Sequence, residues 1–557
     1  MRKIYLITML CLSCSLCWAQ PWAKKASASV FTLKTFAPDG SLLASSNGFF
    51  VGSDGESLGC FTPFKGASRA VVIDAQGKEW PVIEILGAND IYDVVKFRVG
   101  IKKPSALQLA TDGASEGTEA WILPYIVKKQ PNCPKGAVTL AEKFADGYDY
   151  YTLDIKMADQ YVGCPLLNGD GLVIGLMQPS ASQTESRSYA VSAAYANSMR
   201  ISGLSINNQS LRQTQIDKAI PDNSDEAILS LFMAASSLDS LGYSRYLDRF
   251  IQKYPNLPDG YVSRARMHAA ASRFSDAEGE MKQALKVAQK PDEVRYQYAE
   301  LIYQKELYQA DKPYSEWSLE RALNESRQAY QENPLSVYRQ QQAKILFAQK
   351  KYEDAYEIYD ELTRIDQHNA ETFYAAAQCK LQAGKEEEWL ALLDSAVCTF
   401  SRPYLKAAAP YLLTRAQALH QAGKYRQAVG SFNDYAELMA TGLPAEFYYQ
   451  REQAEFGGHL FQQALDDIRH AAELNPKEYV YLAEKARVEM RVGLADDAII
   501  SAQQCISLDD SQSDGYLFLG IAQCVKGLKT EGLQNLQKAK ELGNPQADPL
   551  IEKYQQK

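Results

Sequence analysis

The turn at residues 161–168, Tyr-Val-Gly-Cys-Pro-Leu-Leu-Asn, contains Cys164, whose thiolate could attack a carbonyl carbon. A thiol stays mostly protonated near pH 7 unless a base or a cation lies beside it. The usual base is histidine, and all five histidines follow residue 203: His268, His368, His420, His459 and His470. A serine–lysine pair remains formally open, because a desolvated lysine can act as a base. The first 203 residues therefore contain no Ser-His or Cys-His pair.

Several motifs in residues 26–203 are similar, in the same order, to trypsin-like serine proteases of the bacterial Deg/HtrA family. Residues 154–166 read DIKMADQYVGCPL, where the family has D-x-x-x-x-x-G-N-S-G-G-P-L. The other matching segments are residues 46–52 (SNGFFVG), 59–64 (GCFTPF), 89–97 (NDIYDVVKF) and 188–192 (SYAVS). The resemblance implies a trypsin-like double β-barrel and a common ancestry with these proteases.

The same resemblance implies that the catalytic positions are degenerate. Thr62 stands at the position of the base, Asp93 at that of the orienting acid and Val162 at that of the nucleophile. Valine has no acidic proton and no lone pair, so it cannot act as a nucleophile. Gln160 replaces the glycine whose backbone N–H serves the oxyanion hole, and its Cβ restricts the backbone there. We expect no catalytic residue in this domain.

Composition and local pattern support a β-rich domain over residues 26–203. Short β-branched and aromatic runs alternate with turn signals such as Pro-Asp-Gly at 38–40 and Ser-Asp-Gly at 53–55. Regularly spaced short strands are typical of a closed barrel or a sandwich. Residues 204–224 are polar and interrupted by turn formers, so we expect a linker or a loosely packed connection there.

Residues 225–557 carry an internal repeat with a period near 34 residues. Small residues recur twelve positions apart, at Ala265 and Ala277, Ala343 and Ala355, Ala416 and Ala428, Ala486 and Ala498, and Gly520 and Gly532. Such spacing places small residues where two antiparallel helices cross closely, and the units must stack to bury their apolar faces. The pattern resembles the tetratricopeptide repeat and predicts an all-α solenoid.

Tetratricopeptide arrays commonly bind peptides on the concave face that their first helices form, and the resemblance implies the same face here. The positions that fall on this face are Arg266, Tyr296, Glu300, Tyr303, Lys344, Tyr374, Gln378, Gln417, Tyr449, Gln453 and Arg487. Aromatic and polar side chains suit a peptide-binding groove. An ordinary solvated face with tyrosines packed against their neighbours is the alternative.

Length and composition set broader limits. A chain of 557 residues is too long for a single hydrophobic core, so we expect two or more domains. The net charge of -9 argues against nucleic acid as a partner. Residues 1–19 have the basic start, short apolar stretch and small residues of a cleavable signal peptide, so we expect an exported protein, periplasmic or associated with the cell envelope. Seven cysteines remain after cleavage without a C-x-x-C pair, and we expect no metal, no cofactor and no membrane span.

We therefore expect an exported interaction scaffold: an inactive trypsin-like domain at 26–203, a linker at 204–224 and a tetratricopeptide solenoid at 225–557, with a protein or peptide as partner. One alternative is an active serine or cysteine protease of unusual mechanism whose repeats recruit substrate. Another is a domain that binds a small ligand or a peptide in its former catalytic cleft. Architecture alone does not decide between them.

Overall fold

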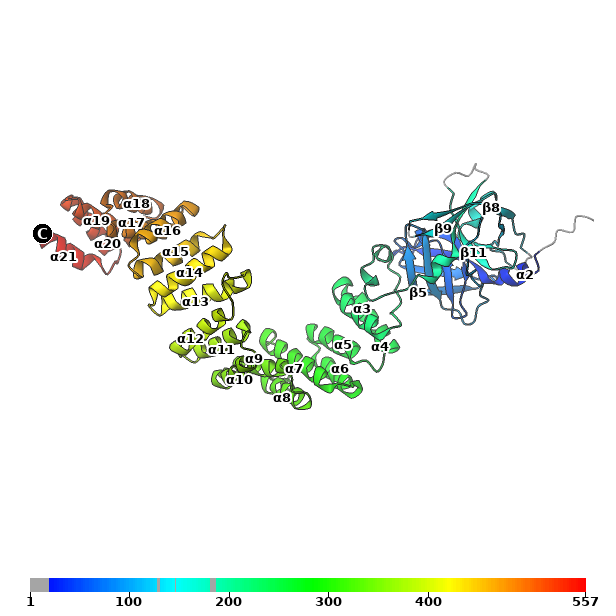
Figure 1. Cartoon of the computed structure of the whole chain (residues 1–557), viewed down its shortest axis with the longest axis horizontal. Helices are drawn as coiled ribbons and strands as arrows, with labels where there is room; N and C mark the ends of the chain where they lie inside the picture. Colours follow the sequence, from blue (N-terminus) through cyan, green and yellow to red (C-terminus); the bar gives the residue numbers. More distant parts are fainter. Residues whose placement is uncertain (1–19, 128–130, 146, 181–186, 557) are drawn as a thin grey trace, which may run out of the picture. The chain divides into compact units, whose positions relative to one another are not determined.

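The computed structural model describes residues 20–127, 131–145, 147–180 and 187–556. The expected signal peptide, residues 1–19, lies outside the described residues. The chain divides into two compact units, Met1–Gln289 and Lys290–Lys557, and each is described by itself. Figure 1 follows the chain from the strands of the first unit to the helices of both units.

Six antiparallel strands close the first barrel in the order β1-β2-β3-β6-β5-β4. These strands are β1 (Val30–Phe36), β2 (Leu42–Phe50), β3 (Glu56–Gly59), β4 (Arg69–Ile73), β5 (Glu79–Asn89) and β6 (Val94–Val99). Side chains that alternate along each strand fill the barrel, as the two-residue period of a strand requires. The ring of Phe31 packs against those of Phe50 and Phe97 at centroid distances of 4.7 and 6.1 Å, which anchors this core.

A second closed barrel has the order β10-β11-β12-β9-β8-β7. Its strands are β7 (Glu119–Ile122), β8 (Lys135–Phe144), β9 (Tyr148–Leu153), β10 (Pro165–Leu167), β11 (Val173–Gln178) and β12 (Ser188–Ser192). A further apolar cluster joins residues of both barrels, including Phe49 and Leu58 of the first with Leu176 and Val191 of the second. The expected double β-barrel is confirmed, and its inter-barrel layer lies beside the degenerate catalytic positions.

The segment expected to be a linker packs against the first barrel. The amide of Gln215 donates to the carbonyl of Ala67 at 2.8 Å, and the amide of Ala219 donates to that of Ile85 at 2.8 Å. Ile216 lies buried in the core of this barrel. The polar composition of residues 204–224 favoured a loose connection, whereas a few apolar side chains and main-chain hydrogen bonds hold the segment along the sheet.

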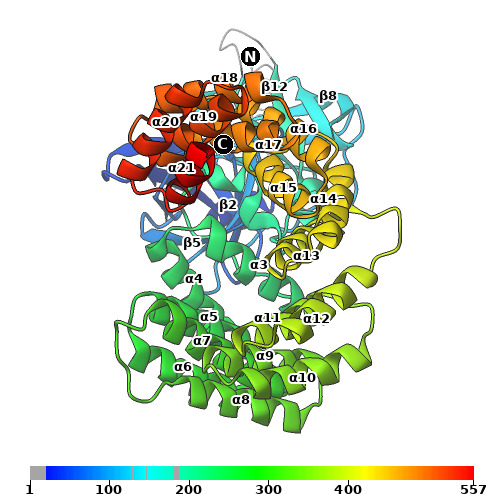
Figure 2. The ribbon, with the colours of Figure 1, turned by 90° about the vertical axis from the view of Figure 1, so that its left-hand side faces the viewer.

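Antiparallel helix pairs make up the rest of the described chain (Figures 1 and 2). An initial pair, α3 (Ser224–Ser237) and α4 (Ser240–Lys253), belongs to the first unit. The first helices of the following pairs are α5 (Pro258–Ala270), α7 (Pro291–Tyr308), α9 (Ser336–Ala348), α11 (Ala370–Gln382), α13 (Ala409–Gln421), α15 (Ala445–Gly457), α17 (Tyr479–Arg491) and α19 (Ser513–Val525).

The second helices are α6 (Phe274–Val287), α8 (Leu319–Glu332), α10 (Tyr352–Ile365), α12 (Glu386–Cys398), α14 (Tyr425–Met439), α16 (Phe461–Leu474), α18 (Ala495–Leu508) and α20 (Lys529–Glu541), and α21 (Ala547–Gln556) ends the described chain. Small residues lie where the partners cross. A Cβ added at Gly520 would come within 2.8 Å of the carbonyl oxygen of Gly532, so this crossing requires glycine. The expected all-α solenoid is confirmed. Among the described residues no helix is long and apolar enough to cross a membrane.

Candidate functional site

Asp93 lies where the resemblance placed the orienting acid. Its carboxylate Oδ1 accepts the backbone N–H of Thr62 at 2.6 Å, and its carbonyl oxygen accepts the N–H of Phe61 at 3.1 Å. The backbone φ of Asp93 is +50°, a left-handed conformation that non-glycine residues rarely adopt. The strand ends therefore still hold a carboxylate beside the position of the base, but the side chain at that position is an exposed threonine.

Val162 directly follows a 3-10 turn, Asp159–Tyr161, and has an extended backbone. Its N–H donates to the carbonyl of Asp159 at 3.2 Å. Its carbonyl oxygen accepts the backbone N–H of Asn47 at 3.3 Å and the side-chain Nδ2 of Asn47 at 3.1 Å. In a serine protease the N–H of the nucleophile belongs to the oxyanion hole. Here that donor is used inside the protein.

Asn47 of β2 fixes this turn, and the sequence analysis did not identify it. Its Nδ2 also donates to the carbonyl oxygen of Gln160 at 2.9 Å, so one buried amide holds two consecutive bends of the turn. Gly163, with φ +78°, passes so close that an added Cβ would lie 2.2 Å from the carbonyl oxygen of Asn47. The turn is thus tied to the other barrel in the conformation that uses the Val162 amide internally.

The two cysteines near the degenerate positions are poor nucleophiles. Cys60 and Cys164 are both free and buried. Burial, with further contributions from Asp93 and Cys164, raises the pKa of the Cys60 thiol well above its ordinary value. Burial also raises the pKa of the Cys164 thiol to about 12. Both thiols are protonated at neutral pH, which disfavours the substitute nucleophile considered from the sequence.

Aromatic side chains occupy the inter-barrel layer next to Asp93. The ring of Tyr195 lies 4.6 Å from that of Tyr92 and 4.5 Å from that of Tyr148. Burial chiefly raises the pKa of Tyr150, and Tyr189, Cys60 and Asp93 add to the rise, which places this phenol near the degenerate positions. In the sequence, the only indication of this aromatic layer was the pair of tyrosines at alternate positions of β9, Tyr148 and Tyr150. The layer is packed with rings, and among the described residues no cluster of metal ligands occurs.

The residues predicted on the binding face all lie on first helices. Arg266 is on α5 of the first unit, and the others are on α7, α9, α11, α13, α15 and α17 of the second unit. Arg266, Lys344 and Gln417 are exposed, and the remaining predicted residues are half-buried. In the second unit α7 contacts α9, and α17 contacts α19. Their shared face can therefore form one surface within that unit.

Three of the predicted tyrosines each pair with a second tyrosine on the next first helix. The ring pairs are Tyr296 with Tyr338 at 5.5 Å, Tyr374 with Tyr411 at 5.7 Å, and Tyr449 with Tyr481 at 5.2 Å. The second member is the third residue of its helix in each case. We call these the three tyrosine pairs. They bridge α7 to α9, α11 to α13 and α15 to α17, a regularity that the sequence analysis missed.

Carboxylates accompany the tyrosine pairs. Burial raises the pKa of Tyr296, and the negative charge of Glu300 raises it further. Burial and then the charge of Glu371 likewise raise the pKa of Tyr411. The hydroxyl of Tyr481 donates to Glu446 at 3.3 Å. Each pair therefore has a carboxylate beside it, and Glu371 and Glu446 are exposed.

Polar contacts join further predicted residues across helices. Gln417 donates to the side chain of Gln450 at 2.9 Å, which links α13 to α15. Arg487 donates to Glu452 at 3.1 Å, which links α17 to α15, and stacks over the ring of Phe456 at 3.7 Å. Burial, which outweighs the attraction of Arg487, raises the pKa of Glu452 to about 8. Several predicted residues thus also hold neighbouring helices together.

Comparisons with known proteins found similarity to solved structures. No family model and no curated protein matches the chain. Among solved structures, the chain is similar to the active form of the Rv3671c protease from M. tuberculosis, with 17% identity, a TM-score of 0.30, and coverage of 37% of this chain and 87% of that one. It is also similar to the HtrA-type protease AlgW with a tripeptide, with 18% identity, a TM-score of 0.29, and coverage of 34% and 64%. With its two closed barrels, the first part of the chain has a trypsin-like double-barrel fold.

Proposed function

We propose that this chain is an exported interaction scaffold whose trypsin-like domain does not catalyse proteolysis. The observation that carries this proposal is the turn at Val162, where the nucleophile is missing and the adjacent N–H bonds to Asp159. The proposal retains an inactive domain at 26–203, a connection at 204–224 and tetratricopeptide repeats at 225–557. It also retains cleavage of residues 1–19 and release into the periplasm or cell envelope.

Three losses act together against proteolysis. Thr62 offers no imidazole, Val162 offers no nucleophilic atom, and the Val162 amide is not free to stabilise an oxyanion. Asp93 remains at the position of the acid. In a working triad the acid orients the base and cannot replace it. The runner-up, an unusual protease, is favoured only by this retained carboxylate. Its candidate thiol, Cys164, is buried and protonated, as is the neighbouring Cys60.

Binding is the work we assign to the first-helix face of the second unit. Aromatic rings are effective anchors at protein interfaces. Glu300, Glu371 and Glu446 beside the tyrosine pairs make the face suited to cations, which ring faces also attract. We therefore propose as partner an extended protein segment with several lysines or arginines. Each cation–ring contact contributes about 0.5–1 kcal/mol at an exposed site, so three together favour a multi-point interaction.

A charge-reversal experiment tests this proposal. Glu371→Lys changes an exposed carboxylate of α11 beside the second tyrosine pair, and Glu437→Lys makes the same change at an exposed position of the second helix α14. Fluorescence anisotropy would follow binding of a lysine-rich peptide and of a glutamate-rich peptide of equal length. We expect the lysine-rich peptide to bind and Glu371→Lys to weaken it about fivefold, with Glu437→Lys close to the parent.

Two results would contradict the binding proposal. Equal effects of both substitutions would show that net charge, and not the tyrosine face, controls binding. Preference for the glutamate-rich peptide would agree with an interaction scaffold but would contradict a lysine- or arginine-rich partner.

A further inference from the structure

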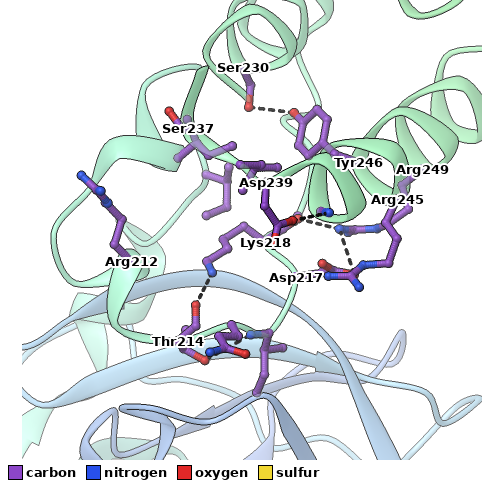
Figure 3. A pocket seen from close by; sticks show the side chains of 17 residues that line it. Arg212, Thr214, Asp217, Lys218, Ser230, Ser237, Asp239, Arg245, Tyr246 and Arg249 are labelled. Carbon is purple, nitrogen blue, oxygen red and sulfur yellow. Dashed lines mark hydrogen bonds and ion pairs between the residues drawn. The ribbon is translucent and has the colours of Figure 1, made fainter. Parts of the chain in front are cut away.

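A cavity of about 290 Å³ lies within the first unit, where the segment after the second barrel meets the first helix pair (Figure 3). One wall comes from residues 201–219, which pack along the first barrel. The other comes from the end of α3 and the beginning of α4, with Leu238 and Tyr246 facing the space. Its lining residues include neither Thr62, Asp93 and Val162 nor any member of the tyrosine pairs, so the proposed function does not account for it.

Lys218 provides the central polar group of this cavity. Its Nζ donates to the carbonyl oxygen of Thr214, which also lines the space (Figure 3). An ammonium group has three N–H donors, and this is its one hydrogen bond to an acceptor among the described residues. Burial lowers the pKa of Lys218 to about 8, against the opposing effect of Asp217. A desolvated ammonium with spare donors favours an acceptor in the cavity.

Two arginines add positive charge at the same cavity. Arg212 and Arg245 line it, are exposed, and form no ion pair with any carboxylate in the part of the chain that the structure describes. Arg249 differs, because its guanidinium pairs with Glu84 at 2.6 Å. The cavity lining therefore carries four cationic side chains, Arg212, Lys218, Arg245 and Arg249, and is positive overall.

Two carboxylates, Asp217 and Asp239, also line the cavity and offset part of its positive charge. Asp217 lies 3.7 Å from the guanidinium of Arg249, and Asp239 accepts the backbone N–H of Gly242 at 2.7 Å as the N-cap of α4. The rest of the lining includes apolar side chains, among them Ile201, Ile206 and Ile216. A cationic rim and interior above an apolar wall fits a ligand that has an anionic head and a short apolar body.

We propose that this cavity binds a small organic carboxylate. The carboxylate would accept hydrogen bonds from Lys218 and meet the charge of Arg212 and Arg245, and the apolar body would lie against the isoleucines. The volume is at the lower end of ligand pockets, which run from about 300 to 1,000 Å³, so the ligand is small. Ordered water alone would satisfy the lysine hydrogen bonds but would bring no negative charge to this positively charged lining.

Occupancy would also stabilise the junction that forms the cavity. The ligand would touch the segment that runs along the first barrel and the beginning of α4, and both surfaces come apart when the unit unfolds. A ligand that binds only the folded form raises the free energy of unfolding by RT ln(1 + L/Kd), where L is the free ligand concentration, and the melting temperature rises with it. Binding and thermal stability are therefore two linked readouts of the same site.

The test uses the full mature chain with hexanoate and benzoate as probes, hexylamine as the opposite charge, and inorganic phosphate as an anion without an apolar body. Saturation-transfer NMR and thermal shift would be measured up to about 10 mM. We expect both carboxylates to bind saturably and raise the melting temperature, and we expect hexylamine not to bind. Phosphate binding of equal strength would overturn the apolar part of the proposal and with it the ligand class.

Substitutions locate the site. Lys218→Met keeps the length of the side chain and should weaken hexanoate about tenfold, and Arg212→Gln or Arg245→Gln should weaken it severalfold. Lys24→Met, at an exposed position outside the cavity, is the matched control and should bind as the parent does. Unchanged binding in Lys218→Met, or no binding by the parent, would overturn the proposal.

A chemical readout remains informative if Lys218→Met fails to fold. Reductive methylation of the parent near pH 8, followed by peptide mass spectrometry, reports the access of reagent to Lys218. Hexanoate should slow methylation of Lys218 severalfold and leave that of Lys24 unchanged. Equal protection of both lysines, or protection of neither, would contradict occupancy of the cavity.

Discussion

Restoring the missing catalytic side chains tests how much of the proteolytic apparatus has been lost. The double variant Thr62→His and Val162→Ser returns a base and a nucleophile to the positions that the fold still holds. Asp93 already bonds to the backbone N–H of residue 62 at 2.6 Å, so its carboxylate can orient an imidazole there. We expect the double variant to regain weak nucleophilic activity.

The expected size of this activity follows from the amide of residue 162, which donates to Asp159 at 3.2 Å. Losing one oxyanion-hole donor lowers kcat by about 10²–10³-fold, or about 3–4 kcal/mol. The double variant should therefore be slower than an intact triad by at least this factor. Adding Gln160→Gly removes the Cβ that restricts the backbone of the turn. If the N–H of residue 162 then turns toward the oxyanion, part of the lost rate should be recovered.

Proteolysis by the parent and its variants would be measured with a fluorogenic casein, and nucleophile labelling with a serine-reactive fluorophosphonate probe. The parent should give neither turnover nor labelling, the double variant slow labelling at residue 162, and the triple variant faster labelling. Adding Asp93→Asn to the double variant should remove most of the gain, since loss of the orienting acid costs about 10⁴-fold in a working triad. Turnover by the parent equal to that of the double variant would refute the reasoning, because the reaction would then lie elsewhere.

Three further predictions concern stability and thiol access. The raised pKa of Glu452, about 8, means that its contribution to stability is complete below about pH 4.5 and is lost as the pH rises through about 8. Glu452→Gln should therefore flatten the pH dependence and gain on the order of 1–2 kcal/mol in urea unfolding at pH 9, and a loss there would show that the charged form is favoured. Gly163→Ala should lower the free energy of unfolding by about 2 kcal/mol or more because its Cβ would meet Asn47, and a melting curve like that of the parent would contradict the clash. In the native chain iodoacetamide should alkylate the exposed Cys398 first and spare the buried Cys60, as peptide mass spectrometry would show; early modification of Cys60 would mean that the inter-barrel layer opens.

The double barrel was predicted from a resemblance to a known family, and the solenoid from a repeat that has a local physical cause. Motifs in a fixed order pointed to the double barrel, and alanines such as Ala416 and Ala428 marked where helices cross. The conformation of the turn at Val162 could not be predicted, because it depends on Asn47, which is more than a hundred residues away and belongs to the other barrel. Hydrogen bonds at such separation leave no periodic signal in one sequence.

The sequence predicted which residues lie on the candidate binding face, but it did not predict which of them contact one another. The repeat period placed Tyr296, Tyr374 and Tyr449 on first helices. Their partners, such as Tyr411, became evident only when neighbouring helices were packed together. The segment 204–224 shows the opposite limit: its composition is polar, yet Ile216 anchors it in the first barrel. Average polarity describes the exposed majority of a segment and not the few side chains that hold it.

One measurement addresses the central claim that the chain binds a cationic segment and does not cut it. A fluorescent lysine-rich peptide is incubated with the full mature chain, its anisotropy is followed, and its mass is determined after prolonged incubation. We predict a saturable rise in anisotropy and recovery of the peptide at its original mass. Cleavage products that disappear when one serine or cysteine of residues 26–203 is substituted would contradict the account, and so would the absence of any binding.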